Sequence, residues 1–399
     1  MTSLRRIAFP AMAFLLTQLA ASAQNYKQTN LVSSVSGVAP VTDSSLSNAW
    51  GLTRGSSTPW WVSDNGSGVS TLYTGTGTKV ALTVTIPAAV SGKTGSPTGV
   101  IFNGSSTDFL LAPSTPAHFI FSTIDGMIVG WNNPTAGAMA VVKTKDHSVY
   151  TGLTSAVANG QRYLYAANFA KGRVDVYDSA FHRVWFDNEH DSAASADEMG
   201  DDRGDEDRSE QAFTDRRLPP NFDPFNVQAI GNDIVVTYAL HMPGNPVETD
   251  GPGLGRVDIY SATGRLLLRL QHGDWLNAPW GVALAPLDFG TYSHDLLVAQ
   301  FAGGGMTESS GWIAAYDLAT GRFVGVLKDA SGNPLSINGV WGISFGNPGA
   351  DTSTSTPNYD TAGAPAAEMY FTAGPNHGSE GLFGFVTPVS TELVTGSDQ

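Results

Sequence analysis

Short apolar runs, rich in β-branched and aromatic residues, recur along this chain with polar turns between them. The six strongest are WWVSDN from Trp60, FLLAPS from Phe109, YLYAAN from Tyr163, IVVTYA from Ile234, LLVAQF from Leu296 and MYFTAG from Met369. Runs of this length, bounded by Gly, Asn, Asp and Ser, are typical of β-strands. The pattern therefore predicts an all-β chain with these runs as its central strands.

A shorter signature precedes each apolar run: a small, cyclic or aromatic residue, then Trp, Thr or Phe, then Gly or Asn, then an aliphatic residue. Its six copies are AWGL (49–52), PTGV (97–100), YTGL (150–153), PFNV (224–227), PWGV (279–282) and VWGI (340–343). A repeat at intervals of this order indicates one supersecondary unit used six times. We expect each copy to be the first strand of its unit.

A third run follows each apolar run, and in it a Gly precedes an aromatic residue. The pairs are Gly68 with Tyr73, Gly126 with Trp131, Gly172 with Tyr177, Gly255 with Tyr260, Gly311 with Tyr316 and Gly381 with Phe385. Fourth runs such as RLLLRL from Arg265 follow tight turns. Three or four strands per unit, repeated six times, predict a six-bladed β-propeller.

The sixth unit has no fourth run after Phe385, whereas the segment 26–34 before the first unit reads as a strand. We expect this N-terminal strand to complete the last blade and close the ring, which protects the sheet edges. The signature Gly is expected to allow the innermost strands to approach the axis closely. Trp50, Trp280 and Trp341 share one signature position, and we expect them to be buried between blades.

The N-terminus combines Arg5 and Arg6 with a mostly apolar stretch and the site Ala21-Ser22-Ala23. These features predict a signal peptide at residues 1–23 and an exported, periplasmic or extracellular protein. The propeller would then occupy residues 24–388, followed by a polar tail at 389–399. An acidic insertion at about 187–210 and a Ser/Thr/Gly/Pro-rich loop at about 347–365 have no apolar pattern, so we expect both to be mobile.

Composition narrows the function classes. The chain has no Cys, so disulfides, thiol catalysis and Cys-bound metals are excluded. Its formal net charge of −15 argues against binding to nucleic acids or to anionic lipid. No segment after the signal has the roughly 18 apolar residues of a membrane-spanning helix. We expect a monomer whose partner is an extracellular or periplasmic protein or a glycan.

Several segments resemble a known family. NAPWGVALAP from Asn277, DPFNVQAIG from Asp223, INGVWGISFGN from Ile337 and YFTAGPN from Tyr370 are similar to a group of exported bacterial proteins, uncharacterised, with a six-bladed, NHL-like propeller. The resemblance covers essentially all of the mature chain. Its motifs are structural, so it implies the fold and names no function. The acidic run is outside the pattern of that group.

Polar residues cluster where loops enter first strands and leave second strands, which places them on one face of a propeller. These candidates for a ligand face are Asn48, Asp64, Asn65, Asn168, Asp223, His241, Asn277, Gln300, Asn338, Asn376 and His377. Such a ring of amide and carboxylate oxygens suits a sugar, a lactone or a hard cation. The alternative is that Asn and Asp satisfy turn geometry through bonds to the backbone.

Catalytic signatures are weak. The eight His residues stand singly, without the spacing of a zinc site, although His241 and His377 fall in suitable loops for a base. Asp201, Asp202, Asp205, Glu206 and Asp207 do not follow the spacing of a calcium-binding EF-hand, because Arg203 and Glu206 occupy the wrong positions. No cofactor is expected, and a divalent cation such as Ca²⁺ at the channel mouth is left open.

Two function classes follow. The first is a non-catalytic scaffold that binds a protein or a glycan through one propeller face. The second is a metal-assisted hydrolase or lyase, similar to a lactonase, that acts in the central channel. At least two carboxylates and a His close together at the axis would favour the enzyme, whereas an axis of Gly, Asn and aliphatic residues would favour the scaffold. Fold alone does not decide between them.

Overall fold

The computed structural model describes residues 25–132, 137–186, 193–195, 212–245, 247–302, 311–346 and 368–389. The predicted signal peptide, the loop at 347–365, all but one residue of the tail and most of the acidic insertion lie outside the described residues. Within the predicted insertion, Ala193–Ser195 form strand β17, which pairs with β16.

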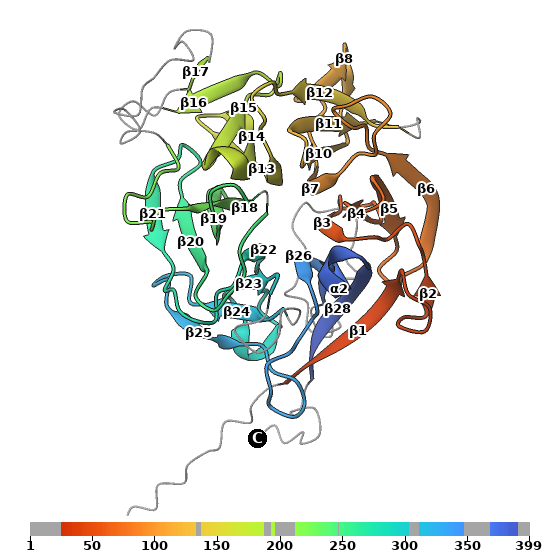
Figure 1. Cartoon of the computed structure of the whole chain (residues 1–399), viewed down its shortest axis with the longest axis vertical. Helices are drawn as coiled ribbons and strands as arrows, with labels where there is room; N and C mark the ends of the chain where they lie inside the picture. The colour runs from red at the N-terminus through yellow and green to blue at the C-terminus, as the bar shows by residue number, and fades with distance from the viewer. Residues whose placement is uncertain are drawn as a thin grey trace, which may run out of the picture.

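Six sheets, antiparallel apart from the short β1–β2 pair, stand around a central axis, so the chain is a six-bladed β-propeller as predicted (Figure 1). The first strand of each blade lies nearest the axis. Blade 1 contains β3 (Ala49–Thr53), β4 (Trp60–Asp64), β5 (Val69–Tyr73) and β6 (Lys79–Thr85). Blade 2 contains β7 (Pro97–Phe102), β10 (Phe119–Thr123), β11 (Met127–Trp131) and β12 (Met139–Lys143). Blade 3 contains β13 (Tyr150–Ala158), β14 (Gln161–Asn168), β15 (Arg173–Tyr177), β16 (Arg183–Phe186) and β17.

The remaining blades follow the same order. Blade 4 contains β18 (Phe222–Ile230), β19 (Asp233–Leu240), β20 (Gly255–Tyr260) and β21 (Leu266–Arg269). Blade 5 contains β22 (Pro279–Leu284), β23 (Leu296–Gln300), β24 (Ile313–Tyr316) and β25 (Phe323–Val326). Blade 6 contains β26 (Val340–Gly346), β27 (Glu368–Ala373), β28 (Leu382–Val389), β1 (Asn25–Ser33) and β2 (Val41–Thr42). Short helical turns are η1 (Phe169–Lys171), η3 (Gly290–Tyr292) and α2 (Pro375–Gly378).

The N-terminal strand closes the ring, as predicted. β1 pairs antiparallel with β28 from Asn25 opposite Val389 to Ser33 opposite Leu382, and the red and blue strands run together in Figure 1. Tyr26 is 1% exposed and its hydroxyl donates to the carbonyl of Phe289 at 2.9 Å. β1 therefore also holds blade 6 against blade 5.

The prediction that the run from Phe109 forms the second strand of blade 2 was wrong. The run from Phe109 instead forms a small hairpin of β8 (Leu110–Ala112) and β9 (Thr115–Pro116), and β10 is the second strand. Pro113 and Pro116 explain the difference, because proline has no N–H for the ladder of a central strand. The apolar run FIFST, which follows these prolines, pairs on both sides instead.

The signature glycines let the first strands touch. A Cβ on Gly51 would lie 2.4 Å from the carbonyl oxygen of Thr98 in the next blade, and one on Gly281 would lie 2.2 Å from that of Trp341. Blade 4 has Asn226 at this position, and its side-chain amide donates to the carbonyl of Trp280 at 2.7 Å. Contact between first strands thus continues around the ring.

Candidate functional site

The front face is the side of the propeller where first strands begin and second strands end. The axis beneath it is narrow: the cavity between the first strands measures about 20 Å³, room for about one water molecule. It is bounded by Gly, aliphatic residues and amides, namely Gly51, Leu52, Gly99, Val100, Leu153, Asn226, Gln228, Gly281, Val282, Gly342 and Ile343, together with Trp280. This lining is the one that the sequence analysis associated with a scaffold.

Aromatic side chains fill the axis at the front face. We call Trp50, Phe225, Trp280 and Trp341 the central cluster; the rings of Trp50 and Trp341 stack with centroids 3.9 Å apart. Trp50 also meets Phe225 of the opposite blade at 6.4 Å. The tryptophans are buried, as predicted, with at most 6% of their surface exposed. Their place was not predicted, because they meet each other on the axis instead of packing between separate blade pairs.

Hydrogen bonds fix this cluster across the ring. The indole N–H of Trp280 in blade 5 donates to the carbonyl of Thr151 in blade 3 at 2.9 Å. The indole N–H of Trp341 donates to Oδ1 of Asn48 at 3.1 Å. Phe301 stacks on Trp341 with centroids 4.2 Å apart. The channel mouth on the front face is therefore closed by packed rings.

Three of the predicted ligand-face residues lie below the surface. Asn168 is fully buried and donates to Oδ2 of Asp175 at 2.7 Å. Gln300 is also fully buried, and its Oε1 accepts from the backbone N–H of Asn277 at 2.9 Å. Oδ1 of Asn277 accepts from the backbone N–H of Gly251. These amides stabilise loops, which is the alternative that the sequence left open.

Asp64 is also inside the protein, between blades 1 and 6. Its Oδ2 accepts from the backbone N–H of Thr71 at 2.9 Å, whereas its Oδ1 is buried and has no hydrogen-bond partner within the described part of the chain. Burial raises the pKa of this carboxyl well above its usual range. Asp64 therefore has no access to a ligand on the front face.

The other amide candidates are nearer the surface. Nδ2 of Asn48 donates to Oδ1 of Asn65 at 3.4 Å, and Nδ2 of Asn65 donates to the carbonyl of Pro97. Asn338, Asn376 and His377 are exposed. Asn376 and His377 adopt positive φ angles of 52° and 56° in α2. The structure does not bring these three residues together with Asp223 and His241.

Asp223 and His241 do form a pair. Oδ2 of Asp223 lies 2.7 Å from Nδ1 of His241, and the other ring nitrogen lies 2.8 Å from the carbonyl oxygen of Asn245. The imidazole stacks on Phe169 with centroids 4.4 Å apart. Burial raises the pKa of Asp223, and the bond to His241 opposes that shift. Both ring nitrogens are thus already engaged within the protein.

The loop after His241 projects from the front face. Met242 and Val247 are among its exposed apolar residues, at 45% and 55%. The carboxyl of Glu248 is enclosed, although part of its side chain reaches the surface, and burial raises its pKa to about 7. Exposed Met side chains are common on adaptable binding surfaces.

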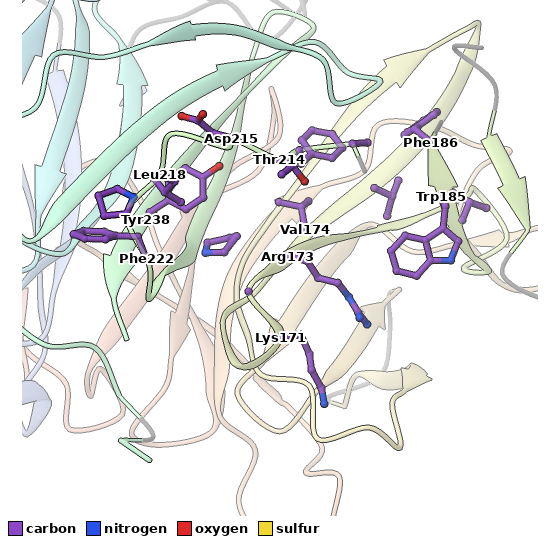
Figure 2. Close-up of a pocket in the computed structure, with 17 residues that line it drawn as sticks. Lys171, Arg173, Val174, Trp185, Phe186, Thr214, Asp215, Leu218, Phe222 and Tyr238 are labelled. Atoms are coloured by element: carbon purple, nitrogen blue, oxygen red, sulfur yellow. The ribbon is translucent and has the colours of Figure 1, made fainter. Parts of the chain in front are cut away.

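A groove of about 360 Å³ lies next to this pair, between blades 3 and 4 (Figure 2). Its volume is within the range of small-ligand sites, about 300–1,000 Å³. We call it the blade 3–4 groove; it is lined by Lys171, Gly172, Arg173, Val174, Val176, Val184, Trp185, Phe186, Ala212, Phe213, Thr214, Asp215, Leu218, Pro219, Phe222, Pro224 and Tyr238. A Cβ on Gly172 would lie 2.7 Å from Oδ1 of Asp223, so the groove borders the Asp223–His241 pair.

Cations gather at one end of the groove. Figure 2 labels Lys171, Arg173 and Trp185 in the same part of the groove, and Lys171 and Arg173 both act on the carboxylate of Asp146. The guanidinium carbons of Arg173 and Arg183 lie 5.3 Å and 5.2 Å from the centre of the Trp185 ring. Nε of Arg173 donates to the buried Asp175 at 2.7 Å. At the other end, Arg269 makes two bonds of 2.6 Å to Asp215, which neutralises that carboxylate.

The groove was not predicted from the sequence. Its cations and Trp185 lie on and beside the third and fourth strands of one blade, outside the repeated signatures. A weak signal was present, since Arg183 and Trp185 alternate along one strand and Arg173 begins its neighbour. Alternate residues share a face of a sheet, so these side chains meet.

The described residues contain no group of three or more His, Asp or Glu side chains arranged to hold a metal ion. Among those same residues, no helix has the length and hydrophobicity to cross a membrane.

Sequence comparison corrects the family resemblance. An uncharacterised protein of Acanthamoeba polyphaga mimivirus is 30% identical over 228 residues, which are 56% of this chain and 37% of that protein. Two further uncharacterised mimivirus proteins are each 26% identical over 90% of this chain, covering 80% and 85% of their own lengths. No protein-family model matches. The assignment to an exported bacterial family was wrong, because these relatives are viral and no family is matched.

The chain spans little more than a third of the first of these relatives. Solved structures with a similar path of the backbone are more distant in sequence. They include hydrazine synthase of Kuenenia stuttgartiensis (11% identity, TM-score 0.43, 85% of this chain and 77% of that chain) and virginiamycin B lyase of Staphylococcus aureus (8%, 0.41, 92% and 100%). The propeller is established by the chain's own six sheets, and likenesses this distant add nothing about a ligand.

Proposed function

We propose that this protein is a non-catalytic binding module that takes up part of a partner protein or a glycan in the blade 3–4 groove. The observation that carries the proposal is the contrast between the groove and the axis. The groove is bordered by an exposed loop, and some of the polar groups in its wall have hydrogen-bonding capacity that the fold does not use. The axis is packed with aromatic rings.

Catalysis in the channel has less support. A general base must present a free nitrogen or oxygen to the substrate. His241 directs one nitrogen at Asp223 and the other at the carbonyl of Asn245. The alternative of a metal-assisted hydrolase or lyase also needs a ligand cluster at the axis, where the residues described are Gly, amides, aliphatics and Trp.

The sequence of residues 1–23 supports export of this module, and the closed ring of blades supports a monomer. We therefore include export and a monomeric state in the proposal. An exported module with an acidic surface would meet its ligand outside the cell that makes it, in keeping with a protein or glycan partner.

A substitution that fills the groove with a large side chain tests the proposal. Thr214 is exposed at the groove wall, so Thr214→Trp should occupy the groove without disturbing the core. Wild type and variant would be screened against an array of glycans and peptides, with Ser91→Trp, on an exposed loop between blades 1 and 2, as the matched control. We expect Thr214→Trp to abolish binding and Ser91→Trp to keep it. A ligand that binds Thr214→Trp as well as wild type would refute the groove as the site.

A further inference from the structure

The polar groups of the blade 3–4 groove define the chemistry of its ligand. Lys171 is exposed; it attracts the carboxylate of Asp146 electrostatically but forms no close ion pair with a described residue. Arg173 uses Nε for Asp175 and reaches Asp146 only weakly, with Nη2 at 3.5 Å. Its Nη1 has no bond to the residues that the structure describes. A guanidinium keeps its charge and donates along a fixed fork, which suits a carboxylate.

Two neutral groups in the same groove are also unused. The indole N–H of Trp185 and the hydroxyl of Thr214 make no hydrogen bond within the described ranges, and both residues line the groove. Four groups with unused hydrogen-bonding capacity, two of them cationic, therefore face one space of about 360 Å³. A ligand that carries one carboxylate and several hydroxyls would satisfy them together.

The charge of the whole chain limits the ligand further. The chain has a formal net charge of −15, so a densely charged polyanion is repelled before it reaches the groove. A ligand whose negative charges are separated by neutral hydroxyl-bearing parts is repelled less. An acidic sugar meets this condition better than an acidic peptide with consecutive carboxylates.

We infer that the blade 3–4 groove binds a carboxylated sugar, with the carboxylate held by Lys171 and Arg173 and the ring hydroxyls bound by Thr214 and the indole N–H of Trp185. This inference rests on the proposed function and names the ligand class of the same site. Lys171 and Arg173 provide the specificity for acidic over neutral sugars.

The test is a calorimetric titration of the full exported chain with trigalacturonic acid and with its methyl ester, which removes the charge and keeps the ring hydroxyls. We expect the acid to bind at least tenfold more tightly than the ester. Lys171→Gln should weaken binding of the acid about tenfold or more, as expected when a charge-assisted bond is lost. Lys93→Gln, an exposed lysine on a front-face loop between other blades, is the control and should bind like wild type.

Each other result has a distinct meaning. Equal binding of acid and ester, abolished by Thr214→Trp, would overturn the carboxylate inference and leave the groove as a binding site. Binding of a hexaglutamate peptide in the groove, with neither sugar bound, would overturn the sugar inference in the same way. Binding of the acid that survives Thr214→Trp would overturn both this inference and the proposed function.

Discussion

Tryptophan has two different environments in this propeller. At the centre of the front face, Trp50, Trp280 and Trp341 contact each other, and the indole N–H of Trp280 donates to the carbonyl of Thr151 two blades away. In the blade 3–4 groove, Trp185 is only partly buried and lies beside two arginines. The first arrangement removes the axis from solvent, and the second leaves the indole N–H of Trp185 within reach of a ligand. Repeated positions build the centre, whereas positions particular to one blade build the groove.

The largest expected effect comes from opening the ring that holds the centre together. Removal of residues 1–33 deletes β1, which pairs along its length with β28 and buries Tyr26 against blade 5. We expect the truncated protein to show no cooperative unfolding transition near the melting temperature of the intact chain. A variant starting at residue 25 is the control. A truncated protein that melts like this control would show that blade 6 is stable without its N-terminal strand.

The next effect separates the two tryptophan environments directly. Trp341→Ala should cost about 3–5 kcal/mol of unfolding free energy, because a fully packed ring is replaced by a cavity. Trp185→Ala should cost about 1 kcal/mol or less, since it loses only partly exposed contacts with Arg173 and Arg183. Chemical denaturation of both variants measures the difference.

Equal losses of unfolding free energy for Trp341→Ala and Trp185→Ala would show that the two tryptophan environments do not differ in packing. A small cost at Trp341 would mean that the centre is loosely packed and accessible to a ligand. A large cost at Trp185 would mean that the groove wall is a structural element of blade 3.

The sequence was a good guide to the centre because packing there restricts residue type. A side chain at Gly51 or Gly281 would collide with the next blade, so small residues recur at a fixed place and reveal the first strands. Asn226 is accommodated since its amide makes the inter-strand bond itself. The position of the tryptophans predicted burial, but the partner of each ring depends on the ring geometry of all six blades.

The sequence was a poor guide to the groove and to the second strand of blade 2. Apolar composition at 109–112 indicated a strand, and the flanking prolines decided that it would be a separate hairpin. On the front face, the sequence grouped Asp223 and His241 among the candidate residues, and the structure pairs their side chains. It did not distinguish them from Asp64, Asn168 and Gln300, because an amide or carboxylate in a turn has the same signature whether it points outward or is buried.

Two buried carboxylates of blades 1 and 6, Asp64 and Asp43, should affect stability in opposite ways as the pH changes. The pKa of Asp64 is raised by burial, so the native protein keeps a proton that the unfolded chain loses above its pKa of about 3.9. The stability from this group is therefore full below about pH 4 and is lost as the pH rises toward the folded pKa. Asp64→Asn should be about 1–3 kcal/mol more stable than wild type at pH 7 and similar at pH 4.

Asp43 provides the control with the opposite sign. Burial tends to raise its pKa, but bonds from Lys79 and Tyr73 hold it below its usual value. Its contribution is present above pH 4 and is lost as the pH falls. Asp43→Asn should thus destabilise the protein at pH 7. Unfolding free energies at both pH values test the pair, and a destabilised Asp64→Asn at pH 7 would show that the carboxylate is charged and compensated in the fold.

The smallest expected effect concerns the Asp223–His241 pair at the border of the groove. Asp223→Asn keeps the shape of the side chain and replaces a charge-assisted bond with a neutral one. Both groups of the pair are partly exposed, with side-chain exposures of 24% and 19%, so we expect a cost of about 1 kcal/mol in unfolding free energy. The effect should be local, since His241 joins the loop at Asn245 to the first strand of blade 4. Hydrogen exchange at residues 241–245 should become faster, while exchange in β22 and β26 stays unchanged. Asp233→Asn, an exposed carboxylate in the same blade, should change neither. If Asp223→Asn also speeds exchange around Trp280 and Trp341, the groove and the centre are mechanically coupled, and the separation drawn between the two tryptophan environments does not hold.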